Sequence, residues 1–290
     1  MPFLILVSLI WAFSFGIIGS SLSTLDSTFV AAIRLSLAWL CFMPFFRLQG
    51  INRRNLLTLI GIGALQFGVM YVSYIRAFAF LPSHLVALFS VLTPLYIVIA
   101  HDLIRRQWHW TLLGCAALSV AGAAVIKFSR PSEDFWLGFG LMQIANLAFG
   151  LGQLFYREWR LKRPEIRDSQ VMAALYAGGA AFAGAAFLAW GDFSNVSPDR
   201  NQLLALGYLG VVASGLGFYL WNKGAARSTA GVLAAANNAV VPLAMAASLF
   251  FFGESSNITT QSLAKLAIGA VLIFGAMIWG NRLGGRPKAK

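Results

Sequence analysis

The sequence predicts an all-α integral membrane protein in which ten transmembrane helices form two inverted five-helix repeats around a central cavity. Three observations support this fold class: the composition, the number of apolar stretches and a similarity between the two halves of the chain. Of the 290 residues, 59% are hydrophobic and 11% are charged. A soluble domain carries roughly 25% charged residues. The composition therefore argues against a soluble enzyme.

Ten stretches of the chain are long and apolar enough to cross a membrane, for which a helix needs about 20 mostly apolar residues. Pro82 separates the third stretch from the fourth, which predicts a tight hairpin between them. The stretches together leave no room for a soluble domain. The expected spans are 3–22, 27–46, 55–81, 83–104, 108–128, 135–159, 169–190, 202–222, 228–252 and 260–280.

The basic residues indicate how the spans are oriented. The net charge is +12, from 22 Lys and Arg against 10 Asp and Glu. With the N-terminus inside, most Lys and Arg fall at the inward ends of the spans, as the positive-inside rule requires. We therefore expect both termini in the cytoplasm and the protein in a bacterial inner (plasma) membrane. The positive charge then reflects topology in a lipid bilayer, and we expect no nucleic-acid partner.

The two halves of the chain resemble each other. At an offset of 148 residues, the segment 61–95 matches 209–243, which sets Pro94 against Pro242. Five spans in each half give the halves opposite orientations in the membrane. Such inverted repeats are typical of secondary transporters, whose substrate binds near the midplane between the repeats. We expect Pro94 and Pro242 to act as hinges, and the repeats to occupy residues 1–130 and 131–290.

Several segments in this order also resemble a known family. They are WAFSFG in the first span, AAIRLSLAW in the second, AFAFLPSHLVALFSVLTPL across the third and fourth, and YLWNKGAARSTAGVLAAANNAVVPL and FFGES in the second half. Over essentially the whole chain the sequence is similar to the EamA-like transporter family of the drug/metabolite transporter superfamily. The resemblance implies that spans one to four and six to nine line the cavity. The sequence departs from the family pattern after span four. The family often has Gly-Glu there, as Gly253 and Glu254 follow span nine, but this chain has HDLIRR.

Arg34 is the clearest candidate for a substrate contact. It lies about seven residues inside the second span, where a bare charge costs at least about 2.5 kcal/mol. A cavity-facing guanidinium would hold a carboxylate or phosphate with two parallel hydrogen bonds. The alternatives are snorkelling to the interface and pairing with carbonyls that a broken helix leaves free.

Span six carries a polar stripe, because Gln143, Asn146, Gly150 and Gln153 recur at helical spacing on one face. In lipid these amides must face the bundle, where they either line the cavity or join helices to one another. In span nine, Asn237 and Asn238 lie four to five residues before Pro242, as Ser90 lies four before Pro94. A proline frees the carbonyl four residues earlier, and such matched breaks indicate a transport site.

Aromatic and hydroxyl side chains at similar depth complete the expected pocket. Tyrosine and tryptophan pack against apolar substrate surface and still offer a hydrogen bond. The alternative for these residues is a belt at the membrane interface. The expected contacts of this kind are Trp11, Ser14, Gln66, Tyr71, Tyr74, Ser214, Tyr219 and Trp221.

Motifs for catalysis and metal binding are missing from the sequence. Cys41 and Cys115 have no CxxC or His partner nearby, and the chain has no HExxH, P-loop or GxSxG. We also expect no Asp or Glu inside a span, which argues against a carboxylate relay for cationic drugs. The chain is therefore expected to have no catalytic residue, no metal and no cofactor.

Together these features favour a secondary transporter that moves a small organic metabolite by alternating access. The lone Arg34 favours a neutral, zwitterionic or anionic substrate, and the family resemblance suggests export of an amino acid or a related compound. The alternatives are a broad-specificity exporter of drugs or amphiphiles and an intramembrane enzyme that acts on lipid. We expect a monomer whose partners are its substrate and the bilayer.

Overall fold

The computed structural model describes residues 2–106 and 133–229, together with scattered positions at 110–118 and 232–279. Over these residues every regular element is a helix. The elements are α1 (Pro2–Ser21), α2 (Ser27–Phe42), η1 (Met43–Phe45), α3 (Arg53–Gly63), η2 (Ala64–Val69), α4 (Met70–Ala77), α5 (Ser83–Phe89), η3 (Ser90–Leu92), α6 (Thr93–Arg105), α8 (Glu133–Leu161), α9 (Asp168–Trp190), η4 (Phe193–Asn195), α10 (Arg200–Tyr208), η5 (Leu209–Leu216) and α11 (Gly217–Ala226).

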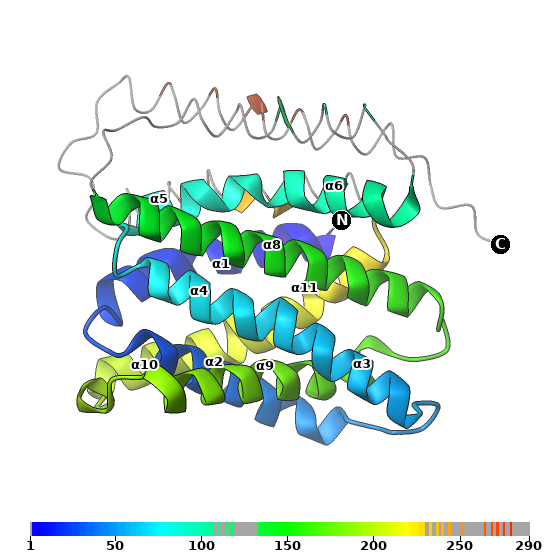
Figure 1. Ribbon diagram of the computed structural model, residues 1–290, viewed down its shortest axis with the longest axis horizontal. Coiled ribbons are helices and arrows are strands. Elements are labelled where there is room, and N and C mark those ends of the chain that lie inside the picture. The colour runs from blue at the N-terminus through cyan, green and yellow to red at the C-terminus, as the bar shows by residue number, and fades with distance from the viewer. Residues whose placement is uncertain are drawn as a thin grey trace.

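The helices lie side by side with their axes roughly parallel (Figure 1). Helix α8 packs between α6 on one side and α4 on the other, and α9 packs against both α2 and α3. Helix α1 contacts α11 and α5 on the inner side of the bundle. Segments that are far apart in the sequence therefore enclose one interior.

Six helices in the described part of the chain are long and apolar enough to cross a membrane. They coincide with the expected spans one, two, three, six, seven and eight. The expected span 83–104 consists of α5, η3 and α6, and a short turn around Pro82 joins α4 to α5. Most of the spans expected at 108–128, 228–252 and 260–280 lies outside the described residues.

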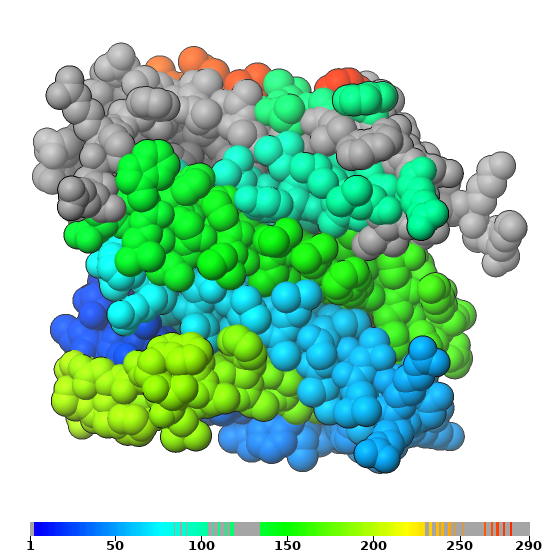
Figure 2. All heavy atoms as spheres, in the orientation of Figure 1, coloured from blue at the N-terminus to red at the C-terminus, as the bar shows by residue number. Residues whose placement is uncertain are grey.

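Large apolar side chains cover much of the outer surface, which Figure 2 shows from one side. Leu57, Leu188 and Leu204 are more than half exposed, as is Trp136 on α8. A bilayer accepts this surface because lipid tails are as apolar as leucine. The exposed leucines thus agree with a membrane-embedded bundle.

Polar side chains cap the helices where loops meet the spans. The Asp26 carboxylate accepts hydrogen bonds from the backbone amides of Thr28 and Phe29 at 2.9 and 2.8 Å, and so begins α2. Asp199 and Gln202 form a reciprocal capping box at the start of α10. Such caps satisfy the amides that the first helical turn leaves free.

Two of the spanning helices contain a π-helical segment near their middle. The third expected span passes without interruption through α3, η2 and α4, and the eighth through α10, η5 and α11. In η5, Ser214 Oγ donates to the carbonyl of Leu209 at 2.6 Å. Wider turns of this kind occur mostly as local insertions, often at functional sites.

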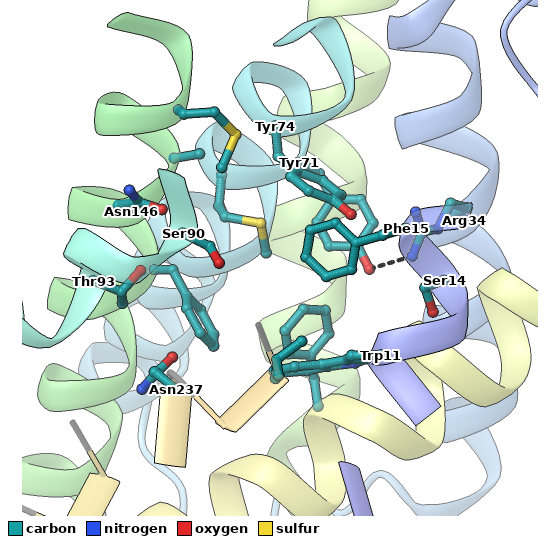
Figure 3. Close-up of a pocket in the computed structure, with 16 residues that line it drawn as sticks. Trp11, Ser14, Phe15, Arg34, Tyr71, Tyr74, Ser90, Thr93, Asn146 and Asn237 are labelled. Atoms are coloured by element: carbon teal, nitrogen blue, oxygen red, sulfur yellow. Dashed lines mark hydrogen bonds between the residues drawn. The ribbon is translucent and has the colours of Figure 1, made fainter. Parts of the chain in front are cut away.

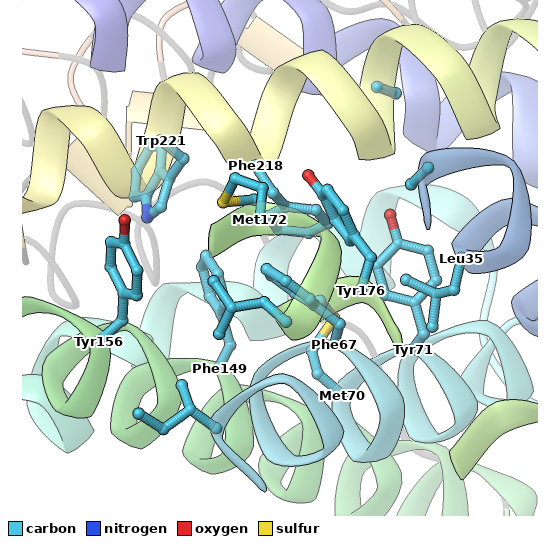
Figure 4. Packing of buried hydrophobic residues seen from close by; sticks show 14 of the residues in the cluster. Leu35, Phe67, Met70, Tyr71, Phe149, Tyr156, Met172, Tyr176, Phe218 and Trp221 are labelled. Atoms are coloured by element: carbon cyan, nitrogen blue, oxygen red, sulfur yellow. The ribbon is translucent and has the colours of Figure 1, made fainter. Parts of the chain in front are cut away.

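Glycine allows the backbones of α3 and α9 to touch. A Cβ at Gly63 would overlap the Leu175 carbonyl, and one at Gly178 would overlap the Ile60 carbonyl. Beside this seam the core is aromatic, with Phe67 stacked on Tyr176 at a centroid distance of 5.1 Å (Figure 4). Small residues at such seams are the usual means of close helix packing in membranes.

Candidate substrate-binding cavity

A cavity of about 670 Å³ lies in the middle of the bundle (Figure 3). This volume counts all the space between the lining atoms and includes open solvent, and about 100 Å³ of it can hold the centre of a water molecule. Its walls come from helices of both halves of the chain, at the centre of the expected spans. The lining residues are Trp11, Ser14, Phe15, Arg34, Met70, Tyr71, Tyr74, Ser90, Thr93, Met142, Ala145, Asn146, Phe149, Phe218, Asn237 and Val240.

Arg34 places a guanidinium at one side of this cavity, where Figure 3 shows its hydrogen bond to Tyr71. Its Nη2 donates to the Tyr71 hydroxyl at 2.9 Å, and its Nε donates to Ser214 Oγ at 3.3 Å. The Tyr71 hydroxyl and Ser214 Oγ are themselves 2.7 Å apart. Groups on α4 and η5 thus hold the Arg34 side chain of α2 in one orientation.

Among the described residues, the guanidinium of Arg34 has no counter-charge. The side chain is 2% exposed, and its Nη1 has no hydrogen-bond partner within the part of the chain that the structure describes. The ion pairs found in that part do not include Arg34. A buried, unpaired donor costs about 1–3 kcal/mol, and more when it is charged. A carboxylate in the cavity would supply both the missing acceptor and the missing charge.

Across the cavity, Asn146 on α8 stabilises the break between α5 and α6. Pro94 has no N–H, and the Thr93 amide bonds to the Ser90 carbonyl in a 3₁₀ turn. The Phe89 carbonyl therefore loses its helical donor, and it accepts a hydrogen bond from Asn146 Nδ2 at 2.7 Å. The proline break was predicted, but the carbonyl left free is one residue earlier than expected, because the 3₁₀ turn satisfies Ser90.

Further polar groups stand on the same side as this amide, as Figure 3 shows. Asn237 Nδ2 donates to the Leu233 carbonyl at 2.8 Å, and Ser90 Oγ donates to the Ala87 carbonyl at 2.6 Å. The Thr93 hydroxyl makes no hydrogen bond among the described residues. This side of the cavity is therefore polar but uncharged.

Aromatic rings close the cavity toward one end of the bundle. Trp11 lies 4.9 Å from Phe218 and 4.9 Å from Trp221 between ring centroids, and Phe149 packs against all three. Trp11 Nε1 donates to the Ala213 carbonyl at 2.9 Å, which anchors α1 to η5.

The structure brings many of the expected substrate contacts together around this one space. Their contact with a substrate stays a prediction. Those that line the cavity are Trp11, Ser14, Arg34, Tyr71, Tyr74, Ser90, Asn146 and Asn237.

Other expected contacts do not line the cavity but join helices to one another. Gln66 Nε2 donates to Asn222 Oδ1 at 2.8 Å, and Trp221 Nε1 donates to Gln153 Oε1 at 2.7 Å. In span six, only one amide of the stripe therefore reaches the cavity. The residues placed outside it are Gln66, Gln143, Gln153, Ser214, Tyr219 and Trp221, while Asn238 and Pro242 lie outside the described residues.

Sequence reasoning missed much of the apolar lining. Phe15, Met70, Met142 and Phe149 face the cavity, yet in sequence they look like any lipid-facing or core residue of a membrane helix. Thr93 was also missed, although its position directly before Pro94 marks a helix break. Apolar lining carries no sequence signal because the same residues suit lipid and ligand equally well.

The expectation that acids stay out of the spans is wrong at two positions. Asp102 lies within α6 and is 1% exposed, with its carboxylate 3.2 Å from His101 Nδ1. Glu158 lies within α8 beside Arg157, to which it bonds at 3.2 Å. Both are near a helix end and neither lines the cavity. Among the described residues, no three His, Cys, Asp or Glu side chains gather to hold a metal ion.

Comparison with known proteins places the chain in a family. The family model described as "EamA-like transporter family" matches residues 1–128 and 136–278. A "Probable biotin transporter" of Pseudomonas aeruginosa is 36% identical over 288 residues, which are 99% of each chain. The "Biotin transporter" proteins of Salmonella typhimurium and Escherichia coli K12 are each 33% identical over 291 residues, covering 100% of this chain and 95% of theirs.

A solved crystal structure of a protein 19% identical to this chain has the same fold. The two superpose with a TM-score of 0.73 over 97% of this chain and 98% of the other. At that identity the match concerns the fold alone. The family match and the similarity of the relatives extend over nearly the whole sequence. The chain therefore belongs to the EamA-like transporter family, and it is a membrane transporter of a small molecule rather than an enzyme.

Proposed function

We propose that the substrate of this transporter is biotin, a carboxylate whose apolar chain ends in a bicyclic ureido head. The observation that carries the proposal is Arg34, whose buried Nη1 has no partner among the described residues beside a cavity of about 670 Å³. The names of the relatives supply the candidate, since three of them are biotin transporters or a probable one.

The lining favours a monocarboxylate over the amino acid suggested by the family resemblance. An amino acid brings an ammonium group, for which a buried site supplies a carboxylate or several carbonyl oxygens. The described lining residues include Arg34 but no Asp or Glu. A zwitterion would therefore leave its positive charge unpaired, whereas biotin carries only the negative charge that Arg34 lacks.

Alternating access between two inverted repeats is the mechanism we propose for moving the substrate. The 148-residue offset carries η2 onto residues 212–217, which overlap η5. The two family matches also divide the chain close to the expected boundary at residue 130. Both observations support a repeat, and Arg34 connects the halves through Tyr71 and Ser214. The expected direction, export, rests on the family resemblance alone and stays a prediction.

Transport by purified protein in proteoliposomes tests this proposal. We expect saturable movement of radiolabelled biotin and thermal stabilisation of the protein by biotin, of about 2.7 kcal/mol at a hundredfold excess over Kd. Arg34→Ala removes both, because the ligand carboxylate loses its counter-charge. Arg76→Ala is the matched control, since Arg76 lies at the exposed end of α4 and does not line the cavity.

A wild-type protein that neither moves biotin nor is stabilised by it contradicts the proposal. Stabilisation by amino acids that survives Arg34→Ala would do the same, because the site would then select a different charge pattern. If Arg34→Ala and Arg76→Ala lose biotin transport and stabilisation equally, any arginine in the spans is needed for folding.

A further inference from the structure

We propose that Asn146, Asn237 and Thr93 form a neutral subsite that binds the ureido ring of the ligand and rejects carboxylates without one. This inference rests on the proposed function, because it assigns the second end of the same ligand. Arg34 accounts for the carboxylate but does not distinguish biotin from any other carboxylate of similar length. Selectivity must come from a different part of the cavity.

The two asparagines present hydrogen-bond acceptors to the cavity. Each side-chain nitrogen donates to a backbone carbonyl, that of Asn146 to Phe89 and that of Asn237 to Leu233. Asn146 Nδ2 also donates to Gln143 Oε1 at 3.4 Å, and together these bonds fix the orientation of both amides. Figure 3 shows both oxygens directed into the cavity. Among the described residues, no donor forms a hydrogen bond with either oxygen.

Thr93 adds a donor beside these acceptors. It is 3% exposed and lines the cavity, and its hydroxyl makes no hydrogen bond to any described residue. The neighbouring Ser90 differs, because its hydroxyl proton is already used on the Ala87 carbonyl. The wall therefore combines two free acceptors with one free hydroxyl donor.

A cyclic urea has the complementary set of groups, namely two N–H donors and one carbonyl acceptor. The Asn146 and Asn237 oxygens match the two N–H groups, and the Thr93 hydroxyl matches the carbonyl. A uniformly neutral wall suits a urea, which is polar but carries no charge. A bound carboxylate that lacks the urea leaves all three groups without hydrogen-bond partners. Because unpaired polar groups in a buried site cost free energy, the site binds such a ligand more weakly.

The two ends of the cavity are separated by apolar surface. In Figure 3 Arg34 lies on the opposite side from Asn146 and Thr93, with Phe15 among the rings between them. Met70, Met142 and Phe149 add further apolar surface to the lining. Its chemistry matches the hydrocarbon chain that joins the carboxylate of biotin to its rings.

Competition between biotin and lipoate tests the subsite. Lipoate carries the same pentanoate chain on a dithiolane ring that has no urea. We expect wild-type protein in proteoliposomes to prefer biotin by more than about a hundredfold in inhibition constant. Asn237→Leu and Thr93→Val should each reduce that preference about tenfold or more, by weakening biotin while leaving lipoate unchanged or improved.

The choice of variants keeps the test independent of folding. Asn146→Leu also removes the partner of the Phe89 carbonyl, so Asn237→Leu and Thr93→Val serve as the main variants. Thr58→Val is the control, because Thr58 on α3 bonds only the Arg54 carbonyl of its own helix among the described residues and does not line the cavity. It should leave the ratio of the two inhibition constants unchanged.

The outcomes separate this inference from the proposed function. If the protein transports biotin but neither variant changes the preference for biotin over lipoate, the subsite is overturned and biotin remains the substrate. Equal inhibition of the wild type by lipoate and biotin does the same. Wild-type protein that does not transport biotin overturns the proposed function, and the subsite with it.

Discussion

At the scale of single residues, the position of Arg34 depends on two neutral hydroxyls rather than on an acid. Tyr71 and Ser214 bond its Nη2 and Nε, and the Tyr71 ring lies 4.6 Å from the guanidinium carbon. Neutral partners orient an arginine without cancelling its charge. The charge therefore stays available to a ligand, whereas an ion pair with Asp or Glu would already have used it.

Tyr71→Phe tests this orientation. The variant removes the hydrogen bond to Arg34 Nη2 and the contact with Ser214 Oγ. A hydrogen bond to a charged group contributes about 1.5–3 kcal/mol, so we expect biotin to bind roughly ten- to a hundredfold more weakly. Thermal shift of the purified protein across a biotin titration measures the change.

Tyr219→Phe is the matched control for Tyr71→Phe. Its hydroxyl only accepts a long bond from Lys223 at 3.3 Å, and it does not line the cavity. The affinity of this variant for biotin should equal that of the wild type. Wild-type affinity in Tyr71→Phe as well would show that Arg34 needs no orientation by this hydroxyl.

At the scale of elements, irregular helix geometry places the polar groups of the site. The break η3 exposes the Phe89 carbonyl that orients Asn146, and η5 carries Ser214, which orients Arg34. Regular α-helices would satisfy their own backbone and leave these side chains without such anchors. The irregular turns are held in place by tight packing against neighbouring helices.

The seam between α3 and α9 shows how much this packing depends on glycine. Gly178→Ala forces a methyl group into the Ile60 carbonyl, and overpacking of this kind costs typically about 1–3 kcal/mol. Thermal unfolding in detergent should therefore occur at a lower temperature than in the wild type.

Gly184→Ala on the same helix is the control, because nothing lies within 4 Å of the Cβ it would add. Alanine favours a helix over glycine, so this variant should be as stable as the wild type or more so. If Gly178→Ala and Gly184→Ala unfold at the same temperature, that result contradicts the close contact of α3 and α9.

At the scale of the whole molecule, the distribution of charge predicts one orientation in the membrane. We expect the loop between α9 and α10 outside and the basic loop between α8 and α9 in the cytoplasm, where Lys and Arg are retained. A protein with Cys41 and Cys115 replaced by serine allows single cysteines to report on each side.

Ser194→Cys in that background should react with a membrane-impermeant maleimide in intact cells, because we expect η4 on the outer side. Glu165→Cys, in the exposed cytoplasmic loop, should react only after the membrane is permeabilised. The reverse labelling pattern would show that the topology is opposite to the one we expect. Labelling of both sites in intact cells would contradict a single orientation.

The sequence by itself determined the features that depend on the bilayer. Spans and the break at Pro94 follow from local chemistry, because a membrane helix must be apolar over its length and must satisfy its own backbone. The same reasoning identified Arg34, since a charge within a span needs a partner wherever the helix packs. These inferences required no knowledge of which helices are neighbours.

Only the tertiary structure decided which polar groups share one cavity. Gln66 and Gln153 looked as suitable as Asn146, but packing pairs them with Asn222 and Trp221 and keeps them away from the cavity. Helical spacing predicts which face of its own helix a side chain lies on. It does not predict which neighbouring helix packs against that face. The π-helical segments also rotate the residues that follow them, so a regular period cannot predict what Tyr71 or Ser214 will touch.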